Sequence, residues 1–356
     1  MTVIATRTSS TFYNLPYNQS AQYWLAIFSV SDNAELNKAL VKRGMRLISK
    51  LGNAYLIPLS YPWDSEWKSV HKLLVQYGAD KQAEVALIPG EKEPTAEEFT
   101  YTRKPVAALN SAADNLWLGK AMLEDRIVCY MQPVLDKRSK VFGYESFARM
   151  ETDKGIVGGG KIIEASRGLN AEYALDRYLH VKAITSFIAS DLEGFLFINF
   201  VPGFIHRPEK YLEGLTDSVK FHGMPPKQLV LDFTQSETPR DVMHLKAIFD
   251  YCRSNGYSLS LDDISSVAMA KKILESIRPD FIKLDIDLVR SALSVPTQQI
   301  IGELVSIAHL SGATVLAEGV ETEAIYTELL KLGVDLFQGY LFSPPVAVSA
   351  LKKAVG

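Results

Sequence analysis

Two adjacent aspartates, Asp262 and Asp263, stand at the end of a short apolar segment of this 356-residue chain. The same arrangement recurs elsewhere, with a polar or charged residue after an apolar segment at Glu145, Asn199, Asp232, Glu318 and Gln338. Adjacent carboxylates repel each other unless cations neutralise them, and hard divalent cations prefer carboxylate and amide oxygens. The pattern predicts a metal-dependent enzyme whose site lies where several strands end.

The oxygen donors can be divided between two divalent ions. The set expected around one ion is Glu145, Asn199, Asp232 and Asp262. A second ion is expected to share Asp262 and to use Asp263. Two metal ions about 4 Å apart stabilise both the attacking and the leaving oxygen in phosphodiester cleavage. The chemistry predicted from these residues is metal-assisted hydrolysis of a phosphodiester.

Three further charged residues accompany these donors. Lys283 has apolar strand neighbours, which favours a place among the anions over a surface salt bridge. Glu318 is predicted to orient or deprotonate a metal-bound water, as general bases do within hydrogen-bond reach. Glu321 is open to a second interpretation, because a carboxylate in the first turn of a helix is favoured by the helix dipole.

Short apolar segments alternate with helical stretches from Ile127 onward. Candidate strands are 127–132, 140–146, 195–200, 228–234, 257–262, 280–286, 313–318 and 334–338. Candidate helices between them are 160–167, 175–190, 240–254, 268–277, 298–311 and 321–332. Roughly eight strands over about 235 residues match one (β/α)8 TIM-type barrel, whose strand carboxyl ends meet on one face. A doubly wound open sheet would place polar residues at only one or two switch points, so the barrel is the predicted α/β fold.

The region before the barrel predicts a smaller domain. Strands are expected at 21–30, 54–59 and 83–88, with helices at 33–51 and 65–77, which indicates an α/β or α+β arrangement. Residues 89–105 are rich in Glu, Pro and Thr and are expected to be a solvated linker. The predicted division is an N-terminal domain at 1–105, a connecting helix at 106–124 and the barrel at 125–356. The N-terminal domain shows no chemistry of its own, and a regulatory or dimerising role is expected for it.

Composition excludes several classes of protein. The net charge of −3 does not suit a DNA-binding surface, and no apolar stretch approaches the roughly 18 residues of a membrane span. The two cysteines, Cys129 and Cys252, have neither metal-site nor disulfide spacing. The first residues lack an apolar signal-peptide core, so a cytoplasmic location is expected.

One glycine-rich segment imitates a phosphate-binding loop. Residues 155–161 have the glycine and lysine spacing of a P-loop, but Ile162 replaces the Ser or Thr that would hold Mg²⁺. With no apolar strand before it, the segment is expected to be a flexible loop. The scattered histidines, among them His180, are expected to be ordinary core or surface residues.

Several motifs, in order, make the region from about Met122 to Val346 resemble the EAL-domain family of cyclic di-GMP phosphodiesterases. They are Tyr130–Val134, Gly143–Arg149, Ile198–Asn199, Leu261–Asp263, Phe281–Asp285, Ala317–Thr322 and Gln338–Tyr340. In the segment that names the family, Ser146 and Phe147 replace Ala and Leu after the glutamate. Each motif alone is weak, but the ordered set is specific.

The resemblance implies hydrolysis of cyclic di-GMP to linear pGpG with Mg²⁺ or Mn²⁺, two ions being expected. It implies that Glu145, Asn199, Asp232, Asp262 and Asp263 hold metal, that Lys283 contacts the attacking water and that Glu318 is the base. It also implies that the substrate is contacted by Gln132, Arg149, Glu321 and Gln338, Arg149 gripping a phosphate through its bidentate donors. A homodimer, and a protein partner acting through the N-terminal domain, are further expectations.

Three departures from the family pattern fall on one structural unit. Asp232 and Gln235 stand where the family has glutamates, and residues 264–268 lack the glycines of the usual loop. Aspartate is one methylene shorter than glutamate, while Mg²⁺ tolerates little deviation from a ligand distance of about 2.1 Å. The departures leave open an enzyme of reduced activity and a receptor that binds cyclic di-GMP without cleaving it. A degenerate scaffold is a third reading, opposed by the retention of Arg149, Lys283 and Glu318.

Overall fold

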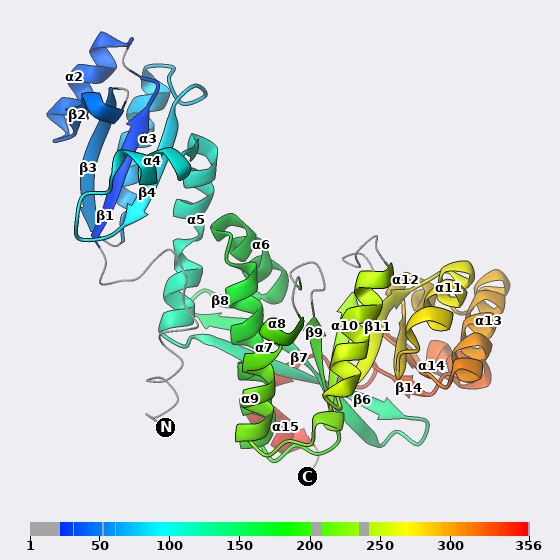
Figure 1. The fold of residues 1–356 in the computed structure, drawn as a ribbon. Helices are drawn as coiled ribbons and strands as arrows, with labels where there is room; N and C mark the ends of the chain where they lie inside the picture. Colours follow the sequence, from blue (N-terminus) through cyan, green and yellow to red (C-terminus); the bar gives the residue numbers. More distant parts are fainter. Residues whose placement is uncertain are drawn as a thin grey trace. The chain divides into compact units, whose positions relative to one another are not determined.

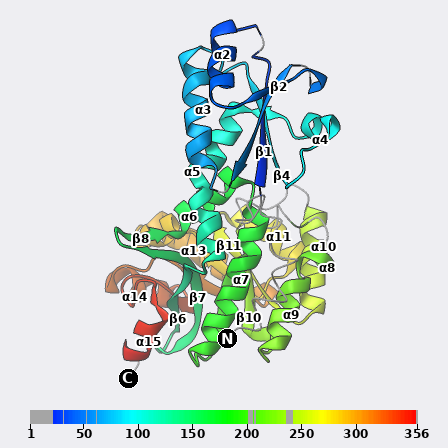
Figure 2. The ribbon, with the colours of Figure 1, turned by 90° about the vertical axis from the view of Figure 1, so that its left-hand side faces the viewer.

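A computed structural model of the chain describes residues 22–30, 32–51, 53–60, 62–200, 205, 208–234 and 242–354. The chain divides into two compact units, drawn in Figures 1 and 2. One contains the described residues up to Arg126 together with Gly160–Leu175. The other contains Ile127–Gly159 and the described residues from Asp176 onward.

The first unit is built on a five-stranded antiparallel sheet with the order β2-β3-β1-β4-β5. Its strands are β1 (Gln22–Phe28), β2 (Arg46–Ile48), β3 (Ala54–Ser60), β4 (Glu84–Pro89) and β5 (Lys104–Pro105). Its helices are α2 (Ala34–Lys42), the 3-10 turn η1 (Ser49–Leu51), α3 (Asp64–Gln76), α4 (Ala96–Tyr101) and α5 (Val106–Leu123). The antiparallel sheet with segregated helices confirms the predicted smaller α+β region.

The two faces of this sheet bury different side chains of the central strand, because successive residues of a strand point to opposite faces. Ala26 and Phe28 of β1 belong to one apolar cluster, together with Phe99 of α4. Tyr23 of the same strand contacts Trp63, at the start of α3, with ring centroids 6.5 Å apart. Both faces of the strand are therefore covered.

The structure differs from two sequence expectations in this unit. The helix expected over 33–51 ends at Lys42, because Gly44 adopts a left-handed φ of 86° and the chain then enters β2. The expected linker at 89–105 is also wrong, since it contains α4, begun by a capping box of Thr95 and Glu98, and strand β5. Phe99 is fully buried there, and this single aromatic side chain ties an otherwise acidic segment to the sheet.

The second unit is a closed eight-stranded barrel, which confirms the predicted fold. The order around it is β6-β7-β9-β10-β11-β12-β13-β14, and β14 pairs with β6 to close the ring. The strands are β6 (Ile127–Asp136), β7 (Val141–Thr152), β9 (Phe195–Phe200), β10 (Leu229–Thr234), β11 (Ser258–Ile264), β12 (Phe281–Leu284), β13 (Thr314–Ala317) and β14 (Leu336–Phe337). All neighbours are parallel except β6, which runs antiparallel to both β7 and β14.

Helices and short connecting elements complete the barrel. They are α6 (Gly159–Leu169), α7 (Glu172–Ala189), α8 (Pro208–Tyr211), α9 (Glu213–Phe221), the 3-10 turn η3 (Pro226–Gln228), α10 (Val242–Ser254), α11 (Val267–Ile277), α12 (Ile286–Arg290), α13 (Val295–Ser311), α14 (Glu323–Lys331), β15 (Val346–Ala347) and α15 (Val348–Ala354). Of these, α6 lies almost wholly within the first unit. Within the parts of the chain that the structure describes, no helix has the length and apolar character needed to cross a membrane.

The glycine-rich segment differs from the expected flexible loop. Gly155–Gly158 forms strand β8, which pairs with the end of β7 in an antiparallel hairpin, and α6 begins at Gly159. A strand in a hairpin with its neighbour does not present its backbone as a phosphate cradle. The exclusion of a P-loop stands, for a different local reason from the one the sequence suggested.

Inside the barrel, side chains two residues apart on the same strand form two layers. The deeper layer is apolar and consists of Val134, Phe197, Val230, Phe281, Leu316 and Leu336. Two positions further along the parallel strands stand Asn199, Asp232, Lys283, Glu318 and Gln338. On the antiparallel β6 the order reverses, so Gln132 comes before Val134. The period of two in a strand thus carries the polar residues to the mouth of the barrel.

Candidate active site

Lys283 is the centre of a charged cluster at the barrel mouth. Its ammonium Nζ lies 2.6 Å from Asp232 Oδ2, 3.2 Å from Glu145 Oε2 and 4.0 Å from Asp262 Oδ1. The ammonium also forms an ion pair with Glu318. The lysine is 1% exposed and Asp232 is fully buried. Four carboxylates, carried by or directly after strands β7, β10, β11 and β13, therefore meet around one cation.

Burial and charge oppose each other in this cluster. Burial disfavours the charged form of Lys283, but the surrounding carboxylates outweigh it and hold the pKa of the ammonium well above its usual value. Burial raises the pKa of Asp232 to about 7, assisted by Asp262 and Glu145 and opposed by Lys283. The pKa of Glu318 is raised for the same reasons, burial being the largest.

The cluster contains more negative than positive charge. Four carboxylates face one ammonium, so three negative charges remain unbalanced when all four are ionised. Asp232 Oδ1 is buried without a hydrogen-bond partner. Buried charge is normally paired or bound to a metal ion. Among the described residues, however, no group of three His, Cys, Asp or Glu side chains already has the arrangement of a metal site.

Asn199 joins this cluster through Glu145. The Asn199 side-chain amide donates to Glu145 Oε1 at 3.2 Å, while Glu145 Oε2 faces the lysine. Asn199 and Asp232 are register partners on the parallel strands β9 and β10. The four donors expected around one ion thus lie on neighbouring strand ends. Gln235, which stands where the family has a glutamate, lies outside the described residues.

The paired aspartates sit on an irregularity of β11. The register between β11 and β12 shifts between Leu261 and Ile264. Asp263 adopts a left-handed φ of 59°, and its N–H donates to Asp262 Oδ1 at 2.8 Å. Burial raises the pKa of Asp263, with further contributions from Asp262 and Asp285. The left-handed turn thus falls on an aspartate, a residue type that tolerates this conformation better than most.

Two glutamines form the neighbouring side of the mouth. Gln338 donates through Nε2 to Gln132 Oε1 at 3.2 Å, and Gln132 donates to the Ser343 carbonyl at 2.9 Å. Gly339 fixes this strand end, because a Cβ there would lie 2.1 Å from the Val320 carbonyl oxygen. The structure therefore brings together Gln132 and Gln338 although they are far apart in sequence.

Two other predicted residues lie outside these contacts. Arg149 donates to the Ala148 carbonyl at 2.8 Å, and its guanidinium lies over the Phe147 ring at 5.7 Å. Glu321 pairs with Arg290 at 2.8 Å and is part of the exposed rim. Arg149 and Glu321 thus lie at the rim of the mouth. They could contact a substrate only if the bound substrate extends from the charged cluster to the rim.

His180, which the sequence predicts to be an ordinary core or surface residue, is buried and contacts a predicted site residue. Its Nε2 lies 3.0 Å from the Asn199 carbonyl oxygen and 3.4 Å from Asp176 Oδ1. Asp176 in turn accepts a hydrogen bond from the Tyr211 hydroxyl. The available signal was the spacing of four between Asp176 and His180 in a helix, which places both on one face.

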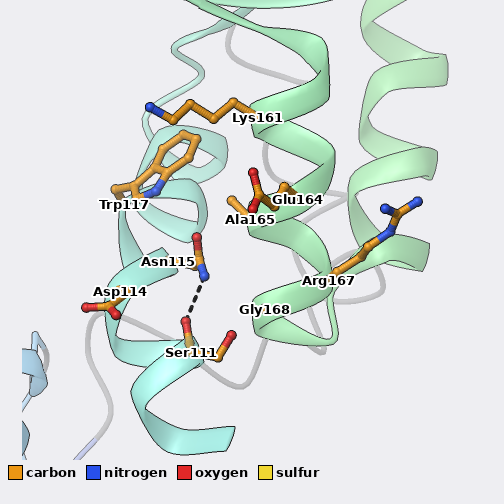
Figure 3. Close-up of a pocket in the computed structure, with 9 residues that line it drawn as sticks. All are labelled: Ser111, Asp114, Asn115, Trp117, Lys161, Glu164, Ala165, Arg167 and Gly168. Atoms are coloured by element: carbon orange, nitrogen blue, oxygen red, sulfur yellow. Dashed lines mark hydrogen bonds between the residues drawn. The ribbon is translucent and has the colours of Figure 1, made fainter. Parts of the chain in front are cut away.

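A pocket of about 580 Å³ lies between α5 and α6 in the first unit (Figure 3). It is lined by Ser111, Asp114, Asn115, Trp117, Lys161, Glu164, Ala165, Arg167 and Gly168. All four of its charged side chains are exposed, and Asp114 pairs with Lys68 at the surface. Acidic and basic groups alternate along it and do not converge on a point, so the barrel mouth is the candidate active site.

Comparison with known proteins identifies the family of the barrel region. A family model described as the EAL domain matches residues 116–345. The "Probable cyclic di-GMP phosphodiesterase PdeI" of Escherichia coli K12 is 27% identical over 260 residues, which are 70% of this chain and 33% of PdeI. The chain spans about a third of the length of the curated relatives it matches first.

Solved structures share the fold. A standalone versatile EAL protein from Vibrio cholerae O395, in its c-di-GMP-bound form, is 28% identical, with a TM-score of 0.57 over 62% of this chain and 93% of that chain. The EAL enzyme Bd1971, in its cAMP- and cyclic-di-GMP-bound form, matches 94% of this chain and 95% of its own, with a TM-score of 0.63 and 19% identity. At that identity the likeness is one of fold.

Proposed function

Because the chain belongs to the EAL-domain family, we propose that it is a metal-dependent phosphodiesterase that hydrolyses cyclic di-GMP to linear pGpG. The observation that carries the proposal is the meeting of four carboxylates around the ammonium of Lys283, with Asn199 hydrogen-bonded to one of them, Glu145. A relative named as a probable cyclic di-GMP phosphodiesterase and a c-di-GMP-bound structural neighbour support the choice of substrate.

The donor set fits Mg²⁺ or Mn²⁺ by its chemistry. Its members are oxygen donors, they carry unbalanced negative charge, and Asp232 Oδ1 is a buried acceptor without a hydrogen-bond partner. The residues that would hold two such ions are Glu145, Asn199, Asp232, Asp262 and Asp263. Bound there, the ions would supply charge stabilisation to the attacking and leaving oxygens.

The remaining residues act on the water and the ligand. Glu318, whose pKa is raised, is proposed as the base that accepts the proton of the attacking water. Lys283 is proposed to hold that water and to offset part of the repulsion between the carboxylates. Gln132 and Gln338 are proposed to seat the dinucleotide at the mouth, and Arg149 and Glu321 to contact it from the rim.

A non-cleaving receptor for cyclic di-GMP is the second candidate. The shortened side chain of Asp232 pairs with the lysine at 2.6 Å, so its carboxylate is engaged by a cation of the protein itself. Metal binding would have to compete with this ion pair. The glutamines and the rim arginine would still bind a dinucleotide.

Incubation with cyclic di-GMP and either Mg²⁺ or Mn²⁺ tests the two candidates, with pGpG followed by chromatography. We expect product from the wild-type chain, and its loss in Asp262→Ala and Glu318→Gln. Asp287→Ala is a matched control, because this carboxylate is 88% exposed on α12. Wild-type product no greater than that of Asp262→Ala would reject the enzyme, and calorimetric binding of cyclic di-GMP without turnover would establish the receptor.

The first unit is proposed to regulate the barrel, with a domain at 1–105 and a connecting helix at 106–124 leading to the barrel at 125–356. A homodimer is also proposed, as is a protein partner bound through the N-terminal domain. Light scattering of the purified chain measures its oligomeric state directly. Neither proposal affects the assignment of the barrel mouth.

A further inference from the structure

His180 lies on the outer side of the barrel wall, directly behind a predicted metal-binding residue. It belongs to α7 and is 4% exposed. Its ring is stacked on Phe200 of β9, with centroids 5.1 Å apart and an interplanar angle of 7°. Its Nε2 faces the carbonyl oxygen of Asn199, one residue earlier on the same strand. One imidazole therefore fixes both the position and the direction of this strand end.

The hydrogen-bond partners define the tautomer of the ring. The Asn199 carbonyl at 3.0 Å and the Asp176 carboxylate at 3.4 Å both face Nε2, and both are acceptors. Nε2 must then carry a proton, because a ring nitrogen without one is itself an acceptor. Burial lowers the pKa of His180 to about 4, so the ring is neutral at physiological pH and still donates through Nε2.

A further contact holds this arrangement from behind. The Tyr211 hydroxyl donates to Asp176, and the Tyr211 ring packs edge-on against Phe200 with centroids 5.3 Å apart. Tyr211, Asp176 and His180 thus form a chain of polar groups that ends on the main chain of Asn199. On the barrel side of that same residue, the side-chain amide contacts Glu145 at 3.2 Å.

We propose that His180 is a positioning residue for the metal site, which sets cation affinity by holding the backbone from which Asn199 projects. The proposal rests on the proposed function, since it assumes that Asn199 and Glu145 bind a cation. Groups that orient metal ligands from behind typically change metal affinity or activity by about 10- to 100-fold when removed. A structural histidine would stabilise the fold without this effect.

Three variants separate these roles. His180→Phe keeps an aromatic ring for Phe200 but has no donor, whereas His180→Gln retains an N–H donor. His222→Phe is the matched control, because His222 lies 3.3 Å from Thr185 of α7, the helix that carries His180, and among the described residues it is not a partner of Asn199. If His180→Phe does not fold, Tyr211→Phe removes only the last hydroxyl of the chain, and the loss of one hydrogen bond is expected to weaken cation binding by about 2- to 10-fold.

The readouts are the Mn²⁺ dissociation constant from calorimetry and the Mn²⁺ concentration at half-maximal turnover. We expect both to rise by about 10- to 100-fold in His180→Phe, with kcat at saturating Mn²⁺ much less affected, and to be largely restored in His180→Gln. Unchanged Mn²⁺ affinity in His180→Phe, or in Tyr211→Phe if the former is unfolded, would overturn the proposal. Wild-type chain that binds Mn²⁺ without turnover rejects only the proposed activity, and calorimetry then decides on His180. Wild-type chain that binds no Mn²⁺ overturns both.

Discussion

The two layers inside the barrel are formed by the same strands, yet burial has opposite energetic effects on their side chains. Phe281 and Lys283 are neighbours on one face of β12, and both are almost completely buried. Burial of the first removes apolar surface from water and stabilises the fold. Burial of the second has a desolvation cost that only its carboxylate partners offset. The deeper layer thus favours stability, and the mouth holds charge in a state suited to chemistry.

Replacement of the central cation should have the largest effect. Lys283→Met leaves the carboxylates of the mouth without their ammonium, and breaking a buried pair in this way commonly costs about 3–5 kcal/mol. We expect that loss in urea unfolding without added metal, together with loss of pGpG formation. Lys246→Met is the control, because Lys246 pairs with Asp250 on an exposed helix face and should change stability by less than about 1 kcal/mol. Equal losses of stability in the two variants would show that the buried ion pairs of the mouth stabilise the fold no more than a surface ion pair does.

Truncation in the deeper layer should be nearly as costly to stability but should spare the chemistry. Leu316 is fully buried in the apolar cluster, two residues before Glu318. Leu316→Ala is expected to lower the free energy of unfolding by about 2–5 kcal/mol. Turnover per folded molecule, measured well below the melting temperature, should stay close to that of wild type. A loss of turnover comparable to that of Glu318→Gln would mean that the layers are not separable.

The pKa of Asp335, a carboxylate outside the barrel interior, shifts in the opposite direction to that of Asp232. Burial acts to raise the pKa of Asp335, but hydrogen bonds from Lys137, the Val315 N–H and His309 outweigh it and lower the pKa below its usual value. Its stabilising contribution is therefore present above about pH 4 and is lost as the pH falls through the lowered folded-state value. Asp335→Asn should cost about 1–3 kcal/mol at pH 7.

Urea unfolding of wild type and Asp335→Asn at pH 7 and pH 3 checks this sign. The difference between the two proteins should be largest at pH 7 and should shrink in acid. A difference that grows as the pH falls would show that the carboxylate is not stabilised by its partners in the folded chain.

The smallest effect is expected at Ser260, which pairs in register with Phe281 of the deeper layer. Its hydroxyl is buried and has no hydrogen-bond partner. Removing an unsatisfied polar group relieves its desolvation cost, so Ser260→Ala should be neutral or stabilising by up to about 1 kcal/mol. Destabilisation beyond that, in calorimetric melting, would show that the hydroxyl is satisfied and belongs with the polar layer.

The barrel and most of its polar residues were predictable because period two and strand ends are local properties of sequence. Each of Asn199, Asp232, Lys283 and Glu318 follows an apolar residue by two positions, which is visible without coordinates. The direction of β6 was not predictable, since an apolar strand has the same pattern whichever way it runs. The pairing of β14 with β6, which closes the ring, was also not visible, because it joins segments that are far apart in the sequence.

Other features depended on contacts between distant segments. The role of His180 depends on its contact with Asn199, on a strand that follows α7, and on Tyr211 further along the chain. The spacing of four residues between Asp176 and His180 indicated only that both lie on one face of a helix. The left-handed backbone of Asp263 was likewise hidden, because a loop without glycine favours no single turn. In the first unit, one capping box and Phe99 outweighed an acidic composition that otherwise favours a solvated segment.

The closure of the barrel makes the mouth a late product of protein synthesis. Gln132 reaches the Ser343 carbonyl across 211 residues, and β15 returns to pair with β6, the strand on which Gln132 stands. A nascent chain that ends before these residues has emerged from the ribosome lacks the last side of the ring. Contacts of such sequence separation are slow to form, so the partly made barrel exposes strand edges that need protection until its final segment arrives.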